Sequence, residues 1–175
     1  MGRNPQIRSQ NVIATKAPGR PAKPNARRAP AIRIVLAPGS RGGVRGLSLE
    51  KIAACTPHLV AGAGREGRYS AGVKVCGDRE MARLHRRYLD DPTTTDVLAF
   101  PAGKGRYLGD VVVCVDVAAR EAARRKHGLE VELMFYVLHG LLHLLGLDDA
   151  TARGRSRMLA LQRAALRTCG LELRA

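Results

Sequence analysis

His139 and His143 stand four residues apart in the stretch YVLHGLLHLLGLDD. At this spacing both rings leave one face of a helix about one turn apart, so they can bind the same metal ion. Gly146 is suited to ending that helix, and the turn it allows would bring Asp148 or Asp149 back toward the rings. A single buried histidine usually only forms a hydrogen bond inside a core. A pair followed by a glycine turn and two acids instead indicates a divalent metal site.

Gly140 follows the first histidine, where zinc proteases of the HExxH type carry a catalytic glutamate. Classical zinc proteolysis is therefore the weakest interpretation of the motif. A bound ion could still make a water molecule acidic enough for hydrolysis, or polarise a phosphoryl oxygen. Together with the positive charge of the chain, this chemistry favours a phosphodiester as the target.

The charge of the chain points to a polyanionic partner. Lys and Arg number 30 against 15 Asp and Glu, which gives a formal net charge of +15 and a pI near 10.8. Such a balance favours RNA, DNA or an acidic membrane surface. With only two Phe, four Tyr and no Trp, aromatic platforms for stacking bases are not expected.

The cysteines and the hydropathy pattern favour an intracellular, soluble protein. Cys55, Cys76, Cys114 and Cys169 are widely separated and form no CxxC pair, so we expect reduced thiols that act as small apolar residues. No apolar run reaches the roughly 18 residues of a membrane span, and no signal peptide is recognisable. We therefore expect a cytoplasmic location.

The 175 residues fit one domain with a tail. Residues 1–30 are rich in Pro, Gly, Asn and Arg and contain no Asp or Glu, which predicts a disordered basic tail. An RNA-contacting arm, a transit-like peptide and an inert extension are all compatible with it. Residues 31–170 are predicted to form the single domain.

Strands come early in this domain and helices late. Short β-rich runs predict strands at 31–38, 70–78, 95–101 and 108–116. Helical spacing predicts helices at 48–64 with Ser48 as cap, 78–89 with Asp78 as cap, 117–126, 129–145 and 153–167. Apolar residues surround the helix at 129–145 on every side, so it should be central and buried. This order indicates an α+β fold, with a small mixed sheet covered by helices.

Four blocks, in order, resemble the YbeY-type endoribonuclease family, also described as ribosomal RNA maturation factors. The blocks are TTTDVLAFP, LGDVVVCVDVAAREA, HGLLHLLGLDD and RMLALQRAAL. The resemblance spans about residues 70–168. It implies a zincin-like fold, one zinc ion per chain, and cleavage of single-stranded RNA in ribosomal RNA processing and ribosome quality control. The implied partners are ribosomal RNA and the ribosome or small-subunit assembly factors.

The same resemblance assigns the site residues. It maps two histidine ligands, which are also the predicted catalytic residues, onto His139 and His143, and a third ligand onto Asp149. A carboxylate is an acceptable zinc ligand, but it lowers the charge of the metal centre from about +2 to about +1, and we expect slower hydrolysis at neutral pH. Asp148 precedes the final ligand as in the family, so we expect it to cap the turn or support a ligand. Apart from the resemblance, Asp110, directly after Gly109, is a candidate carboxylate at the sheet edge or beside the site.

A second departure from the family lies at Leu89, where the family carries an arginine suited to clamping phosphate. Arg86 and Arg87 lie one turn away. They either take over the RNA contact or are simply solvated side chains.

The leading interpretation is a metal-dependent endoribonuclease acting on single-stranded RNA in small-subunit ribosomal RNA maturation. The alternative is a non-catalytic, ribosome-associated RNA-binding factor in which a metal ion only stabilises the fold. The sequence does not identify the general base, because Gly140 occupies the position of the usual one; Asp110 and Asp148 are the candidates.

Overall fold

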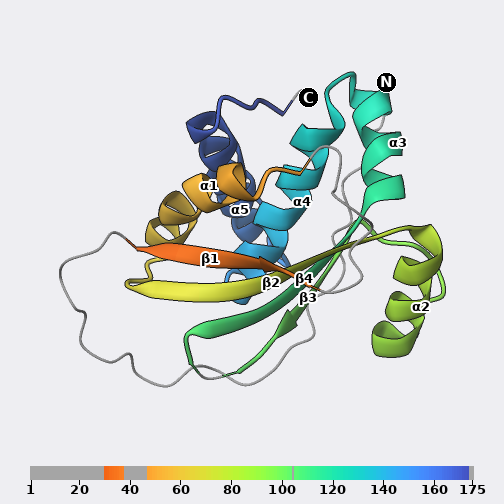
Figure 1. Ribbon diagram of the computed structural model, residues 1–175, viewed down its shortest axis with the longest axis horizontal. Coiled ribbons are helices and arrows are strands. Elements are labelled where there is room, and N and C mark those ends of the chain that lie inside the picture. The colour runs from red at the N-terminus through yellow and green to blue at the C-terminus, as the bar shows by residue number, and fades with distance from the viewer. Residues whose placement is uncertain (1–29, 38–46, 104, 174–175) are drawn as a thin grey trace.

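A computed structural model of the protein describes residues 30–37, 47–103 and 105–173 (Figure 1). Residues 1–29, which make up almost all of the predicted basic tail, lie outside the described residues. The elements in chain order are β1 (Ala31–Leu36), α1 (Leu49–Gly62), β2 (Arg68–Cys76), α2 (Asp78–Leu89), β3 (Val97–Pro101), β4 (Tyr107–Cys114), α3 (Val115–Arg125), α4 (Leu129–Leu144) and α5 (Ala152–Thr168).

The strands form one mixed sheet in the order β1-β2-β4-β3. β1 pairs with β2 and β2 with β4 in parallel, whereas β3 runs antiparallel to β4 at the edge. The predicted α+β class with a small mixed sheet is confirmed.

Alternate residues of the strands serve two different hydrophobic clusters, because successive side chains point to opposite faces of a sheet. Val111 and Val113 of β4 belong to the main core, which also contains buried residues of α1, α4 and α5. Val112 and Cys114 belong to a smaller cluster with Met81 of α2. Figure 1 shows the consequence: α1, α4 and α5 lie together over the sheet, and α2 lies apart from them.

Helix α4 is the centre of the main core. Every residue from 131 to 144 is buried, because β3 and β4 pack on one side of the helix and α3 and α5 on others. The prediction of a buried central helix is confirmed. No helix within the described residues is long and apolar enough to cross a bilayer.

The N-terminal part of α4 holds a buried acid. Glu132 is fully buried, and its carboxylate pairs with Arg125 Nη1 at 2.8 Å and His127 Nε2 at 2.5 Å. Both partners lie at the end of α3 or directly after it. A buried carboxylate is tolerated when paired in this way, so the cluster fixes α3 against α4.

Two local predictions differ in outcome. Ser48 caps α1 as expected, with its Oγ accepting from the Lys51 amide at 3.2 Å. Asp78 does not cap α2: the cap position is Gly77, and the Asp78 carboxylate instead accepts from Arg120 at 2.6 Å. The Asp78 carboxylate pairs with Arg120 and not with the α2 backbone amides, because a guanidinium offers it two N–H donors.

The expectation of four reduced cysteines is wrong for one pair. The structure joins Cys55 of α1 and Cys169, just after α5, in a disulfide across the packed helices. Cys76 and Cys114 are free and buried. Burial raises the pKa of the Cys76 thiol to about 12 and that of Cys114 to about 11, so both stay protonated and act as small apolar residues.

Candidate metal centre

The two histidines of α4 face each other one turn apart. The Nε2 atoms of His139 and His143 are 2.9 Å apart, their ring centroids are 4.6 Å apart, and each residue is 7% exposed. The structure therefore brings together the imidazoles that the i, i+4 spacing predicted. They meet near the C-terminal end of α4, where the chain turns.

The turn after α4 brings in the third group. Gly146 adopts a φ of 94°, and its amide donates to the His143 carbonyl while the Leu147 amide donates to Leu142. This pair of bonds is a Schellman ending, which requires a left-handed residue at the glycine position. As a result the carboxylate of Asp149 lies 3.6 Å from His139 Nε2 and 3.7 Å from His143 Nε2.

The donor set fits a divalent metal ion. Ligands held about 2.0–2.1 Å from a tetrahedral ion stand about 3.3–3.4 Å from one another, and the three observed separations of 2.9, 3.6 and 3.7 Å lie around that value. Among the described residues, His139, His143 and Asp149 are the group of His, Cys, Asp or Glu side chains close enough to share an ion.

The other ring nitrogens of the histidines are already engaged. Nδ1 of His143 bonds to the Leu147 carbonyl at 3.0 Å, and Nδ1 of His139 bonds to the Oε1 atom of Gln162 at 3.3 Å. Because both acceptors require an N–H, each Nδ1 is the protonated nitrogen and each Nε2 presents a lone pair. Such partners orient a histidine for metal binding.

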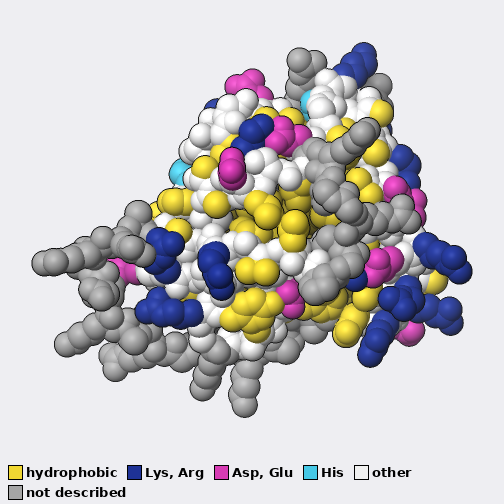
Figure 2. Space-filling model, in the orientation of Figure 1, with side chains coloured by type: hydrophobic (Ala, Val, Ile, Leu, Met, Phe, Trp, Pro, Cys, Tyr) yellow, Lys and Arg dark blue, Asp and Glu magenta, His cyan; other side chains and the backbone are white. Residues whose placement is uncertain are grey.

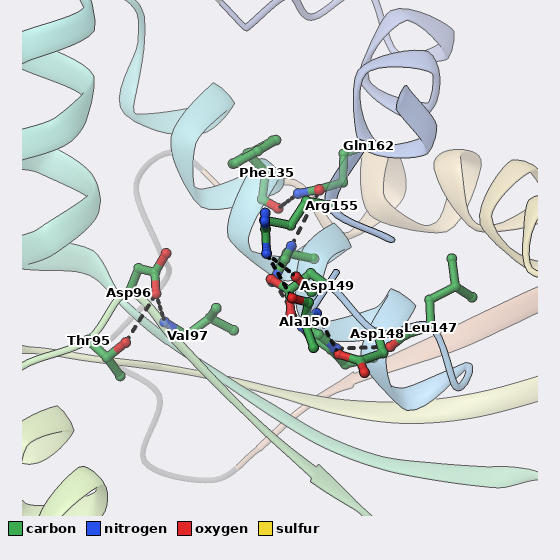
Figure 3. Close-up of polar contacts among 12 residues, drawn as sticks. Thr95, Asp96, Val97, Phe135, Leu147, Asp148, Asp149, Ala150, Arg155 and Gln162 are labelled. Atoms are coloured by element: carbon green, nitrogen blue, oxygen red, sulfur yellow. Dashed lines mark hydrogen bonds and ion pairs between the residues drawn. The ribbon is translucent and has the colours of Figure 1, made fainter. Parts of the chain in front are cut away.

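Gln162 is the residue of this centre that sequence reasoning missed. It is 2% exposed and reaches from α5, with its Nε2 donating to the Phe135 carbonyl on α4 at 3.1 Å (Figure 3). The sequence contained a sign of its burial, because Gln162 follows Met158 at i, i+4 and so shares the buried face of an otherwise arginine-rich helix. A glutamine in that position has to satisfy both ends of its amide.

The surroundings keep both imidazoles neutral. Burial lowers the pKa of His139 below the ordinary histidine value, although the charge of Asp149 acts in the opposite direction. Burial also lowers the pKa of His143, and the neighbouring His139 lowers it further. Neutral imidazole is the form that binds metal ions.

Arg155 and Asp148 shape the turn that carries Asp149. Arg155 Nη1 donates to the carbonyl oxygens of Asp149 and Ala150, each at 3.0 Å (Figure 3). Asp148 is exposed, and its carboxylate accepts from the Ala150 amide at 2.9 Å. Asp148 thus caps the turn, as one of the two roles expected for it.

The packing of α4 on the sheet explains why position 140 is a glycine. A Cβ atom at this position would lie 2.5 Å from a methyl group of Val111 and 3.2 Å from one of Val97. Position 140 therefore faces the sheet at close approach, and a glutamate there has no room. The missing protease base thus reflects how closely α4 packs on β3 and β4.

Three other predicted site residues lie elsewhere. Asp110 shares the sheet face of Val112, not that of Val111 beneath α4, and accepts from the Tyr107 hydroxyl at 2.6 Å. Arg86 and Arg87 are exposed on α2, which packs on that same face. The structure does not bring any of the three to the histidines.

Leu89, for which the resemblance led us to expect a lost phosphate contact, packs against the hydrophobic cluster under α2.

Asp96 is a half-buried acid just before β3, drawn away from the Asp149 turn in Figure 3. Its Oδ1 accepts from the Thr95 hydroxyl at 3.1 Å and from the Val97 amide at 2.9 Å. Burial raises the pKa of Asp96 to about 6, with a further contribution from the charge of Glu132.

Curated proteins are similar in sequence to about half of this chain. Endoribonuclease YbeY of Beutenbergia cavernae is 42% identical over 99 residues, which are 50% of this chain and 66% of that protein. Endoribonuclease YbeY of Thermobifida fusca is 40% identical over 101 residues, 51% of this chain and 65% of that protein. The chain thus spans just under two thirds of the length of these curated relatives.

A solved structure agrees with the fold. The solution structure of TM1509 from Thermotoga maritima matches with a TM-score of 0.57 and 25% identity, over 79% of this chain and 88% of that one. The sequence profile described as "Endoribonuclease YbeY" matches residues 49–170, which contain α1 through α5 and the whole candidate metal centre. The chain therefore belongs to the YbeY endoribonuclease family.

Proposed function

We propose that the protein is a metal-dependent endoribonuclease that cleaves single-stranded RNA in the cytoplasm, during small-subunit ribosomal RNA maturation and ribosome quality control. Its partners would be ribosomal RNA and the ribosome or assembly factors. The catalytic domain would span residues 31–170. The observation that carries the proposal is the closely spaced triad of His139, His143 and Asp149 in a chain of this family.

In this proposal one zinc ion per chain is held by the Nε2 atoms of His139 and His143 and by the Asp149 carboxylate. When bound, the ion would supply Lewis-acid polarisation to a phosphodiester oxygen. The chain's own residues bind and orient the ion. Gln162 and the Leu147 carbonyl hold the imidazoles in one tautomer, and burial of α4 keeps bulk water from the ring faces.

The anionic charge of an ion-bound phosphodiester suits the net charge of +15. On the face drawn in Figure 2, Lys and Arg side chains gather at both sides of the molecule, with acidic groups scattered between them. Arg86 and Arg87, exposed on α2, stay candidates for contacts with RNA that extends around the sheet edge.

A cleavage assay on a labelled single-stranded RNA, with and without a chelator, tests this function. We expect cleavage by the metal-loaded protein, loss of cleavage on chelation, and no cleavage by His143→Ala. If RNA binds but is never cut, while chelation lowers the melting temperature, the non-catalytic RNA-binding alternative replaces the proposal.

A further inference from the structure

A pocket of about 300 Å³ lies beside the turn that carries Asp149, a size at the lower end for a small-ligand site. It is formed where the C-terminal ends of α1 and α4 meet the start of α5. The turn supplies Gly146, Leu147 and Asp148 to its lining, and the next residue of the chain belongs to the metal triad. Whatever occupies the pocket therefore lies against the same turn as the proposed metal ion.

Two guanidinium groups line this pocket. Arg65 Nε donates to the Leu145 carbonyl at 3.2 Å, and Arg157 Nη2 donates to the Gly62 carbonyl at 2.9 Å. These bonds hold each side chain in place but use few of the five N–H donors of an arginine. No described carboxylate lies within ion-pair distance of either one. Both arginines are thus pre-positioned with donors to spare.

The charge of the lining favours an anion. Asp148 contributes one carboxylate, which already accepts from the Ala150 amide, against two guanidinium groups. Helix α5, which borders the pocket, carries five arginines and no acid between residues 152 and 168. Planar guanidinium groups bind phosphate oxygens well.

The start of α5 packs closely against the turn at Gly154. A Cβ atom at Gly154 would clash with the carbonyl oxygen of Asp148. Only glycine leaves the pocket floor in this shape, so the site is built by the packing of α5 on the turn.

We propose that this pocket binds a backbone phosphate of the RNA strand, adjacent to the phosphodiester at the metal centre, with Arg65 and Arg157 as its ligands. The proposal rests on the proposed function for the identity of the strand.

Binding of a short, labelled single-stranded RNA to the metal-loaded full chain tests it, by fluorescence polarisation in the cold over a series of salt concentrations. The test variant is Arg65→Gln with Arg157→Gln. The matched control is Arg163→Gln with Arg167→Gln, which removes the same charge from exposed positions of α5. The melting temperature of each single and double variant is compared with that of the unmodified protein, to check that the fold is kept. A denaturing gel afterwards confirms that the RNA is uncut.

We expect the test variant to bind about tenfold more weakly than the control, as the loss of charged hydrogen bonds predicts. Its slope of log affinity against log salt should be smaller by about 0.7 for one lost phosphate contact. Equal losses in both double variants, or no loss in either, overturn the proposal. Binding is measured in the cold without cleavage, and the separate cleavage assay on the labelled RNA distinguishes the two proposals. RNA that binds through the pocket but stays uncut in that cleavage assay refutes the proposed function alone. Cleavage with control-like binding by the test variant refutes the pocket alone.

Discussion

Gln162→Met removes the amide that links α5 to the candidate metal centre while nearly preserving side-chain length. Two hydrogen bonds are lost, one to the Phe135 carbonyl at 3.1 Å and one to His139 Nδ1 at 3.3 Å. The Phe135 carbonyl keeps its intrahelical partner. The imidazole N–H, in contrast, is left buried without an acceptor.

The expected magnitudes follow from that difference. An unsatisfied buried N–H costs about 1–3 kcal/mol in the free energy of unfolding. Loss of the group that orients a metal-binding histidine weakens metal affinity about 10–100-fold, which corresponds to about 1.4–2.7 kcal/mol. Zinc titration against a competing chelator at neutral pH measures the metal affinity. Urea denaturation of the metal-free protein measures the free energy of unfolding.

Two further variants separate orientation from packing. Gln162→Glu keeps an acceptor for the His139 N–H but loses the donor to Phe135, so it should retain most of the metal affinity even if the fold is less stable. Arg163→Met places the same new side chain on an exposed neighbouring position. If Gln162→Met binds zinc as tightly as Arg163→Met does, Gln162 does not position His139 and the reasoning fails.

The remaining predictions concern acids away from the triad. Glu132→Ala should lower the free energy of unfolding by about 3–5 kcal/mol, because it leaves Arg125 and His127 without their buried partner. The control Glu130→Ala removes a half-exposed ion pair and should cost about 1 kcal/mol or less. Equal losses of stability for the two variants in urea denaturation would contradict the role of the buried cluster. Asp96 has a raised pKa, so its contribution to stability is present below roughly pH 4 and lost as the pH rises through about 6. Asp96→Asn should therefore stabilise the protein by up to about 3 kcal/mol above about pH 7 and hardly at all below about pH 4; a constant difference across the pH range would refute the assignment.

The meeting of the two imidazoles was predictable because its geometry is local: His139 and His143 lie one turn apart on one helix. The glycine ending predicted that an acid would return toward them, but it left Asp148 and Asp149 open, and only the family resemblance selected Asp149. The α+β class was predictable for a similar reason, since strands and helices each have their own period.

Residues whose role depends on tertiary packing were not predictable. Whether Asp110 faces α4 or α2 depends on the register of β4, and a shift by one residue exchanges the two faces. Arg86 and Arg87 belong to α2, which packs on the sheet face opposite α4. Gln162 approaches His139 across 23 positions of sequence, so only the packing of α5 on α4 reveals the contact.

The pairing of Cys55 with Cys169 likewise joins positions 114 residues apart, which no spacing rule connects. Asp78 illustrates a local preference overridden from afar: an acid at a helix start is a good cap, but Arg120 of α3 binds it instead.

The central claim is that His139, His143 and Asp149 hold one divalent ion. Measurement of bound metal per chain by elemental analysis, in the unmodified protein and in Asp149→Ala and Asp148→Ala, tests it most directly. We predict one ion per chain in the unmodified protein and in Asp148→Ala, and loss of the ion in Asp149→Ala. Full metal content in Asp149→Ala, or none in the unmodified protein even after zinc is added, would contradict the account.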